Sequence, residues 1–125
     1  MRSSKRAVRI TANFERNLAG IGRFLEGRDA GLAFGALLED LFDTVIPNLE
    51  TFPEIGRDFL ARVPLSVEGL ARWEKVFRRS RKRGQLREYI AGDYLILYLA
   101  GDNGVALLAI RHHLQLSFDL KMHWT

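Results

Sequence analysis

Apolar positions are most continuous in the C-terminal third of the chain, between residues 86 and 119. Residues 94–99 (Tyr-Leu-Ile-Leu-Tyr-Leu) are apolar at every position, so side chains on both faces of this strand need cover. Residues 105–110 form a second apolar run, and residues 101–104 (Gly-Asp-Asn-Gly) between them tolerate the positive φ angles of a tight turn. The pattern predicts an antiparallel meander with the 94–99 strand at its centre.

Upstream, apolar residues recur at helical spacing in two segments. The first has Thr11 or Asn13 as a candidate N-cap and Gly27 as its stop, and Asp29 can cap the second. The two stripes are Phe14, Leu18, Ile21 and Leu25, then Phe34, Leu37, Leu38, Leu41, Phe42 and Val45. Pro47 should kink or end the second helix, because proline lacks a backbone N–H and crowds the preceding turn. We expect a helical hairpin.

Three shorter segments complete the expected α+β fold. Residues 6–10 alternate in polarity and predict a short first strand, and residues 52–56 (Phe-Pro-Glu-Ile-Gly) predict a turn. Residues 64–84 predict a third helix, with a basic outer face. The predicted fold is a small antiparallel sheet, made of the N-terminal strand and a C-terminal three-strand meander. A helical hairpin and the extra basic helix pack on it, and residues 1–125 form a single domain.

Composition narrows the class of protein. The 125 residues include no cysteine, which excludes disulfides, thiolate metal sites and a catalytic thiol. The longest apolar run is well short of the roughly 20 residues that span a bilayer, and no apolar signal core follows the basic N-terminus. We therefore expect a soluble, cytoplasmic protein with no membrane partner.

Charge is segregated along the chain, with a formal net charge of +4. The basic helix face carries Arg72, Lys75, Arg79 and Lys82, with Arg83 beside it, and acids gather between residues 39 and 58. A solvated helix face is one interpretation of this pattern. The other is a surface for a polyanion, because the dense basic run repels itself until an anionic partner relieves it.

Titratable residues stand at the end of the second hairpin strand, where Arg111, His112 and His113 follow the apolar run. Neighbouring residues of a regular strand point to opposite faces, so Arg111 and His113 could share a site while His112 and His113 could not. A metal pair is therefore not expected. A polar strand end that hydrogen-bonds to backbone is the structural alternative to a functional site.

The order of these features resembles the RelE/ParE superfamily, the toxins of bacterial type II toxin–antitoxin systems. The resemblance is carried by Phe52-Pro53-x-x-Gly56, by Leu86-Arg87, by Gly92-Asp93-Tyr94-x-Ile96-Leu97-Tyr98, and by Leu108-Ala109-Ile110-Arg111-His112-His113. It covers most of the chain and leaves out residues 57–84 and the tail after residue 118. It implies a short acidic antitoxin encoded alongside, which forms a hetero-oligomer with the toxin.

Two activities occur in this superfamily, and the resemblance leaves both open. RelE-like members cut messenger RNA on the ribosome, and ParE-like members poison DNA gyrase. Metal-free RNA cleavage needs a base, an acid and cations around the phosphate. Arg87, Arg111, His112 and His113 are residues of the right type for these roles, and the resemblance matches Arg87 and His112 or His113 to family positions; we expect these four as catalytic residues, with no cofactor. Leu114 stands where many relatives have Arg, and Phe118 where some RNA-cleaving members have Tyr.

The leading expectation from sequence is thus a toxin that cleaves messenger RNA on the ribosome as a metal-independent endoribonuclease. The second is a non-enzymatic inhibitor of DNA gyrase. The third, from a different class, is a non-toxic nucleic-acid-binding module that uses Arg72, Lys75, Arg79, Lys82 and Arg83.

Overall fold

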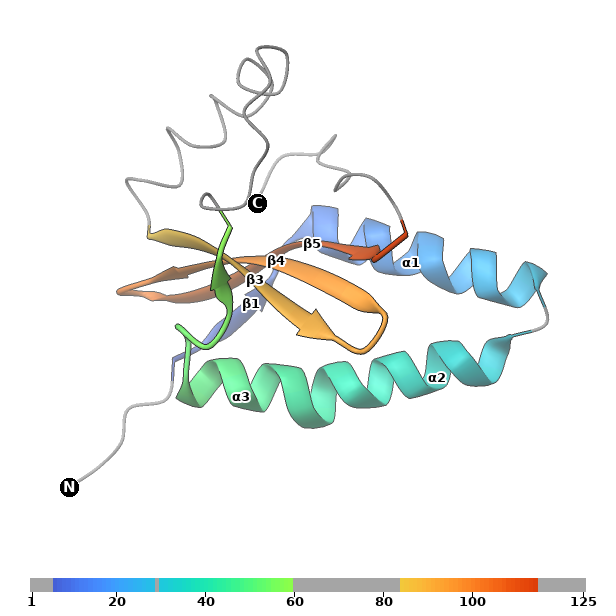
Figure 1. The fold of residues 1–125 in the computed structure, drawn as a ribbon, viewed down its shortest axis with the longest axis horizontal. Coiled ribbons are helices and arrows are strands. Elements are labelled where there is room, and N and C mark those ends of the chain that lie inside the picture. Colours follow the sequence, from blue (N-terminus) through green and yellow to red (C-terminus); the bar gives the residue numbers. More distant parts are fainter. Residues whose placement is uncertain (1–5, 29, 60–83, 115–125) are drawn as a thin grey trace, which may run out of the picture.

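The computed structural model of the chain describes residues 6–28, 30–59 and 84–114. In chain order the elements are β1 (Val8–Ile10), α1 (Ala12–Gly27), α2 (Gly31–Asp40), the π-helical turn η1 (Leu41–Val45), α3 (Ile46–Thr51), β2 (Arg57–Asp58), β3 (Gln85–Ala91), β4 (Tyr94–Gly101) and β5 (Gly104–His112). Figure 1 shows α1 and the continuous arm of α2, η1 and α3 as a hairpin beside the sheet. The predicted α+β class is confirmed. The predicted helix at 64–84, with its basic residues, lies outside the described residues.

The sheet has five strands in the order β1-β5-β4-β3-β2. The meander of β3, β4 and β5 is antiparallel, and β4 lies at its centre, as the uninterrupted apolar run predicts. The structure adds two features to the predicted sheet. β1 pairs with β5 in parallel, from Val8 opposite Val105 to Ile10 opposite Leu107, and the short strand β2 extends the other edge. The sheet is therefore mixed.

The turn between β4 and β5 has the predicted chemistry. The strands meet at Gly101 and Gly104, which lie opposite each other, so Asp102 and Asn103 form a two-residue connection. Gly104 has φ 133°, a left-handed conformation that other residues rarely adopt. The glycine thus allows the two buried strands to pair without a longer loop.

α1 is anchored to β5 through its first residues. Thr11 is the N-cap, because its hydroxyl accepts a hydrogen bond from the Phe14 N–H, and it also donates to the Leu107 carbonyl at 2.7 Å. Asn13 Nδ2 donates to the Leu108 carbonyl at 2.8 Å, and Asn17 Oδ1 accepts from the Ile110 N–H at 3.2 Å. These bonds hold β5 from the end of its pairing with β1 onward. They fix the strand whose end carries the two histidines.

The hairpin of α1 and α2 confirms the prediction and closes through a glycine. A Cβ at Gly22 would lie 2.9 Å from the Phe34 ring, so the missing side chain is what lets the two helices approach. α2 begins after Ala30, which gives no side-chain cap. The predicted cap Asp29 lies outside the described residues.

The second helix passes through Pro47 instead of ending there. Just before the proline the helix makes one π-helical turn, in which the Ile46 N–H donates to the Leu41 carbonyl five residues back instead of four. Pro47 then occupies the first turn of α3, the part of a helix that tolerates proline best. The helix therefore does not end at Pro47. It continues past the proline, with a π-helical turn just before it.

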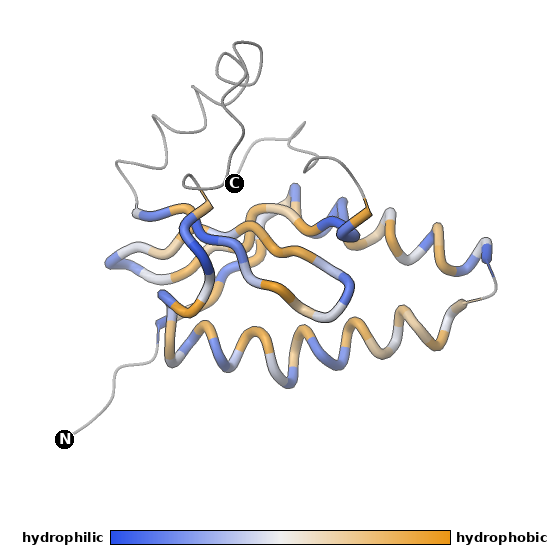
Figure 2. The backbone as a smooth tube through the Cα atoms, in the orientation of Figure 1, coloured by the Kyte–Doolittle hydropathy of each residue, from blue (hydrophilic) through white to orange (hydrophobic). Residues whose placement is uncertain are grey.

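Both faces of the sheet are covered by buried apolar side chains. On the helix side, the cluster includes Phe14, Leu37, Leu41, Val45, Leu49, Ile96, Tyr98, Leu107 and Ile110. On the other side, the cluster includes Phe59, Leu86, Leu97, Leu99 and Leu108. In Figure 2 hydrophobic colours run through β4 and β5 and alternate with hydrophilic colours along the helices. Each fully buried aliphatic side chain stabilises the fold by about 1.5–3 kcal/mol.

Candidate functional site

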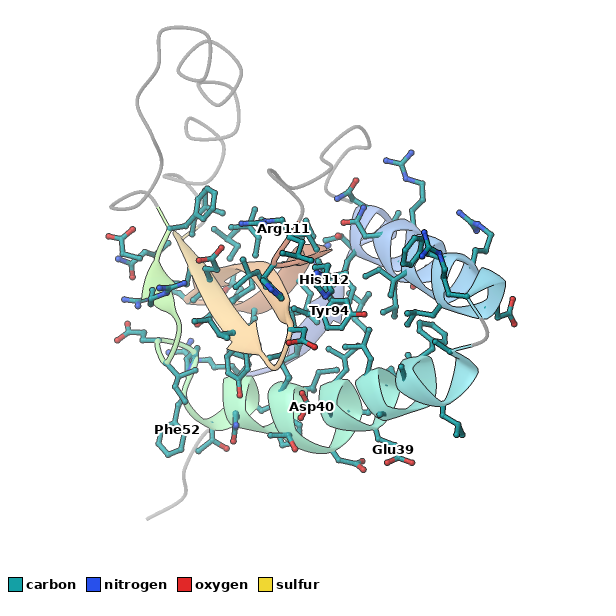
Figure 3. All side chains as sticks on the ribbon, turned by 45° about the vertical axis from the view of Figure 1, so that its right-hand side comes forward. Glu39, Asp40, Phe52, Tyr94, Arg111 and His112 are labelled. Atoms are coloured by element: carbon teal, nitrogen blue, oxygen red, sulfur yellow. The ribbon has the colours of Figure 1, made fainter. Side chains whose placement is uncertain are left out.

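The predicted tip is built on the end of β5 and the start of β4. His112, the last residue of β5, lies opposite Tyr94, and their rings meet edge to face with centroids 5.3 Å apart. Figure 3 shows these two side chains side by side at the end of the sheet. Tyr94 is partly buried against the core cluster on the helix side, so the His112 ring rests on a side chain that the core holds in place.

The two histidines also lie together, contrary to the prediction for a regular strand. β5 ends at His112, so the alternation of faces does not extend to His113. The two ring centroids are 4.4 Å apart and the rings are inclined by 30°. The His113 N–H donates to the Asp93 carbonyl at 2.9 Å, which bends the chain back onto the turn between β3 and β4. The tip is therefore a compact pair of imidazoles.

Backbone contacts set a different tautomer for each neutral ring. Nδ1 of His112 accepts from the Leu114 N–H at 3.2 Å, so the proton of this ring sits on Nε2. Nδ1 of His113 lies 3.1 Å from the Asp93 carbonyl oxygen, which can only accept, so Nδ1 carries the proton of that ring. When both rings are neutral, these contacts leave a donor at Nε2 of His112 and an acceptor at Nε2 of His113.

Arg111 belongs to the same tip and contacts its backbone. One guanidinium nitrogen lies 3.4 Å from each of the carbonyl oxygens of His112 and His113. Arg111 lies opposite Leu95, one register position before the pair of Tyr94 and His112. Neighbouring register positions face opposite sides of a sheet, so Arg111 projects from the face away from Tyr94. The structure brings Arg111, His112 and His113 together, with the Arg111 guanidinium against the backbone carbonyls of the two histidines.

Arg87 is not part of this cluster. It lies opposite Tyr98, four residues before Ala91, which is the β3 partner of Tyr94. At about 3.3 Å per residue, four residues place it roughly 13 Å along the strand from the tip. Its guanidinium donates to the carbonyls of Glu54 at 3.1 Å and Gly56 at 2.5 Å. Arg87 therefore holds the loop 52–56.

The loop 52–56 is a second organised feature, which the sequence predicts as a turn and as part of the family resemblance but not as a site. Tyr98 is fully buried, and its hydroxyl donates to the Pro53 carbonyl at 2.8 Å and accepts from the Gly56 N–H at 2.9 Å. A Cβ at Gly56 would lie 2.7 Å from both the Glu88 carbonyl oxygen and the Tyr98 hydroxyl. The Pro-x-x-Gly spacing is the signal for this loop, because only glycine allows so close an approach.

Both tyrosines of β4 keep their protons at neutral pH. Burial raises the pKa of Tyr98, and this effect outweighs the hydrogen bond from Gly56 and the charge of Arg87, which lower it. Burial and the nearby carboxylate of Asp93 raise the pKa of Tyr94. Tyr98 therefore remains able to donate its hydroxyl proton to Pro53.

Two classes of site find no support in the described parts of the chain. Within residues 6–28, 30–59 and 84–114, no three His, Asp or Glu side chains come close enough to bind a metal ion. Among the helices that the structure describes, none has the length and apolar character needed to cross a membrane. Arg72, Lys75, Arg79, Lys82 and Arg83, the predicted nucleic-acid-binding residues, lie outside these ranges.

Comparison with known proteins bears on the whole of this architecture. The model of one protein family, described as the ParE toxin of the parDE type II toxin–antitoxin system, matches residues 8–116. No curated protein matches the chain significantly. The matched segment begins with β1 and extends beyond the tip, so it includes the loop 52–56, Arg87 and both histidines.

Proposed function

The chain belongs to the ParE toxin family of type II toxin–antitoxin systems, and on this premise we propose that it stops growth by binding DNA gyrase. Membership of the family implies an antitoxin partner. The parDE assignment favours the activity of ParE-like toxins over the messenger RNA cleavage that led the expectations from sequence.

One observation carries this choice, which is the separation of Arg87 from the tip. Cleavage of RNA without a metal requires a base, an acid and a cation around a single phosphate. Arg87 instead donates to two carbonyls of the loop 52–56, and Arg111 lies on the sheet face away from Tyr94. Four residues that could form a catalytic set are thus divided between two places. A toxin that acts by binding needs no such set.

The test of this proposal is a supercoiling assay with purified toxin and gyrase. We expect the toxin to block supercoiling, and we expect messages on ribosomes to remain intact. The double variant His112→Ala with His113→Ala should inhibit gyrase within about threefold of the wild type, because both side chains lie outside the gyrase contact that we infer below. Full supercoiling activity at saturating toxin would overturn the proposal.

Ribosome-dependent RNA cleavage is the second candidate, and the paired imidazoles favour it. When both rings are neutral, Nε2 of His113 can accept a proton and Nε2 of His112 can donate one, and these are the two roles that general base and general acid catalysis uses. This candidate predicts new messenger RNA ends after induction of the toxin. The ends should disappear in the double histidine variant, while gyrase remains active in the presence of the wild-type toxin.

A further inference from the structure

The loop 52–56 displays two large apolar side chains to solvent. Phe52 is 60% exposed and Ile55 is 51% exposed, although the chain has a buried cluster on each face of the sheet. Figure 3 shows Phe52 projecting outward, far from the tip with Tyr94 and His112. The backbone of this loop is nevertheless held by side chains of the sheet.

Three sets of contacts fix the loop from within. The Ile55 N–H donates to the Phe52 carbonyl at 3.0 Å, which closes the turn. Tyr98 bridges Pro53 and Gly56 from the core, and Arg87 binds the carbonyls of Glu54 and Gly56. The contacts engage the backbone of the loop and leave the side chains of Phe52 and Ile55 outside. A rigid backbone with exposed apolar side chains lowers the entropy cost of binding.

We propose that the loop 52–56 is the surface through which this toxin docks on its protein target, an inference that rests on the proposed function. Phe52 and Ile55 would enter an apolar pocket of the target, as aromatic and aliphatic anchors do at the centre of protein interfaces. A toxin that acts by binding needs such an anchor, and the loop presents one on a backbone that is already held in place.

Charge around the loop defines the chemistry of the pocket. Glu54 is exposed between the two apolar residues. Two cations lie near it. Arg57 is paired with the buried carboxylate of Glu88 at 2.9 Å, and the Arg87 guanidinium donates to the backbone carbonyls of Glu54 and Gly56 instead of to the Glu54 carboxylate. The target surface should therefore place a basic side chain at the rim of the apolar pocket.

A second exposed phenylalanine provides a matched control. Phe24 is also 60% exposed, but it lies near the end of α1 with the Arg28 guanidinium 5.0 Å from its ring centroid. Leu32, at the start of α2, is 93% exposed. The pair Phe24→Ser and Leu32→Ser removes at least as much exposed apolar surface from the helical hairpin and leaves the loop 52–56 unchanged.

The test compares two double variants in the full chain, Phe52→Ser with Ile55→Ser, and Phe24→Ser with Leu32→Ser. Growth inhibition after induction and gyrase binding are measured for both, and thermal unfolding shows that each is folded. We expect the loop variant to lose about tenfold or more in both measurements and the control variant to keep them. A loop variant as toxic as the wild type would overturn the docking role.

Two single changes sharpen the test without removing the anchors. Tyr98→Phe deletes the hydroxyl that fixes the loop, and we expect about a threefold weaker inhibition because the loop then has to be ordered on binding. Glu54→Lys should weaken binding about tenfold at low salt and less at high salt. Binding that Glu54→Lys leaves unchanged at both salt concentrations would overturn the basic rim.

The remaining outcomes separate this inference from the proposed function. If wild-type toxin leaves gyrase untouched and the loop variant still loses toxicity, the docking role stands with another protein target and the gyrase proposal falls. If the loop variant turns a dimer into a monomer in sedimentation and stays fully toxic, the loop is an interface between copies of the chain and the docking role falls.

Discussion

The loop 52–56 and the tip at His112 and His113 differ in where their polar groups point. At the loop, side chains of β3 and β4 reach inward to backbone atoms, from the fully buried Tyr98 and from Arg87. At the tip, two imidazoles lie against each other at the end of a strand, and backbone atoms of Asp93 and Leu114 bind them. One site displays apolar side chains on a fixed backbone, and the other displays titratable groups.

This difference teaches that residue type alone does not assign a role. Arg87 is the residue a phosphate site would use, yet its guanidinium satisfies two loop carbonyls. The histidines are residues that often cap a strand, yet backbone contacts give them complementary tautomers. In the two proposals the loop has a role in binding and the tip a role in proton transfer, and variants of each site show which of the two the toxin needs.

The largest expected effect comes from breaking the loop at Gly56. In Gly56→Ala the new Cβ would lie 2.7 Å from the Glu88 carbonyl oxygen and the Tyr98 hydroxyl, so β3 or the tyrosine has to move. We expect a loss of about 3 kcal/mol in the free energy of unfolding, measured by urea denaturation. Gly35→Ala is the control, because a Cβ there meets nothing within 4 Å. Since alanine favours a helix over glycine, this change should raise the free energy of unfolding by about 0.5–1 kcal/mol. Equal urea midpoints for Gly56→Ala and the wild type would contradict the close packing.

The next effect is that of Arg87→Ala, which tests the contrast between the two sites directly. Removing hydrogen bonds from a charged donor to two carbonyls should cost about 2 kcal/mol of the free energy of unfolding. His112→Ala should cost only about 0.5–1 kcal/mol, since it loses one ring contact with Tyr94 and one acceptor for the Leu114 N–H. An Arg87→Ala variant that is as stable as the wild type but inactive would assign Arg87 to the chemistry instead of the loop.

How far the sequence predicts these two sites depends on the range of their contacts. The strand β4 follows from six consecutive apolar residues, and the loop turn from Pro53 and Gly56, because both signals are local. The bonds from Arg87 join a side chain to carbonyls 31 and 33 residues away. A backbone carbonyl has no residue type, so no sequence pattern marks it. The parallel pairing of β1 and the bend after His112 escaped prediction because tertiary contacts decide them.

A smaller effect is expected from Tyr98→Phe, and it depends on pH. Near neutral pH the variant should lose about 1 kcal/mol, because the Gly56 N–H and the Pro53 carbonyl lose their partner. The pKa of Tyr98 is raised in the folded state, so the unfolded chain loses this proton first, from about pH 10. The stability contributed by the phenol is thus complete below about pH 10 and is lost as the pH rises through the folded pKa.

Urea midpoints measured from pH 8 to 11 check this prediction. The urea midpoint of the wild type should fall more steeply above about pH 10 than that of Tyr98→Phe. Tyr94, whose pKa is also raised, leaves a shallower fall in the variant. Parallel curves for the two proteins would mean that Tyr98 is already ionised or already exposed in the folded state.

The smallest effect on stability is expected at the tip, from His113→Ala. This change removes an exposed ring that contacts the Asp93 carbonyl and the His112 ring, and it should alter the free energy of unfolding by about 0.5 kcal/mol or less. Its effect on toxicity decides between the two sites. If the loop alone delivers the toxin to its target, His113→Ala stops growth as the wild type does, while Phe52→Ser with Ile55→Ser does not. If His113→Ala is harmless to cells yet fully folded, the His113 imidazole is needed for the toxic activity, and the loop then serves only to bring the tip to its substrate.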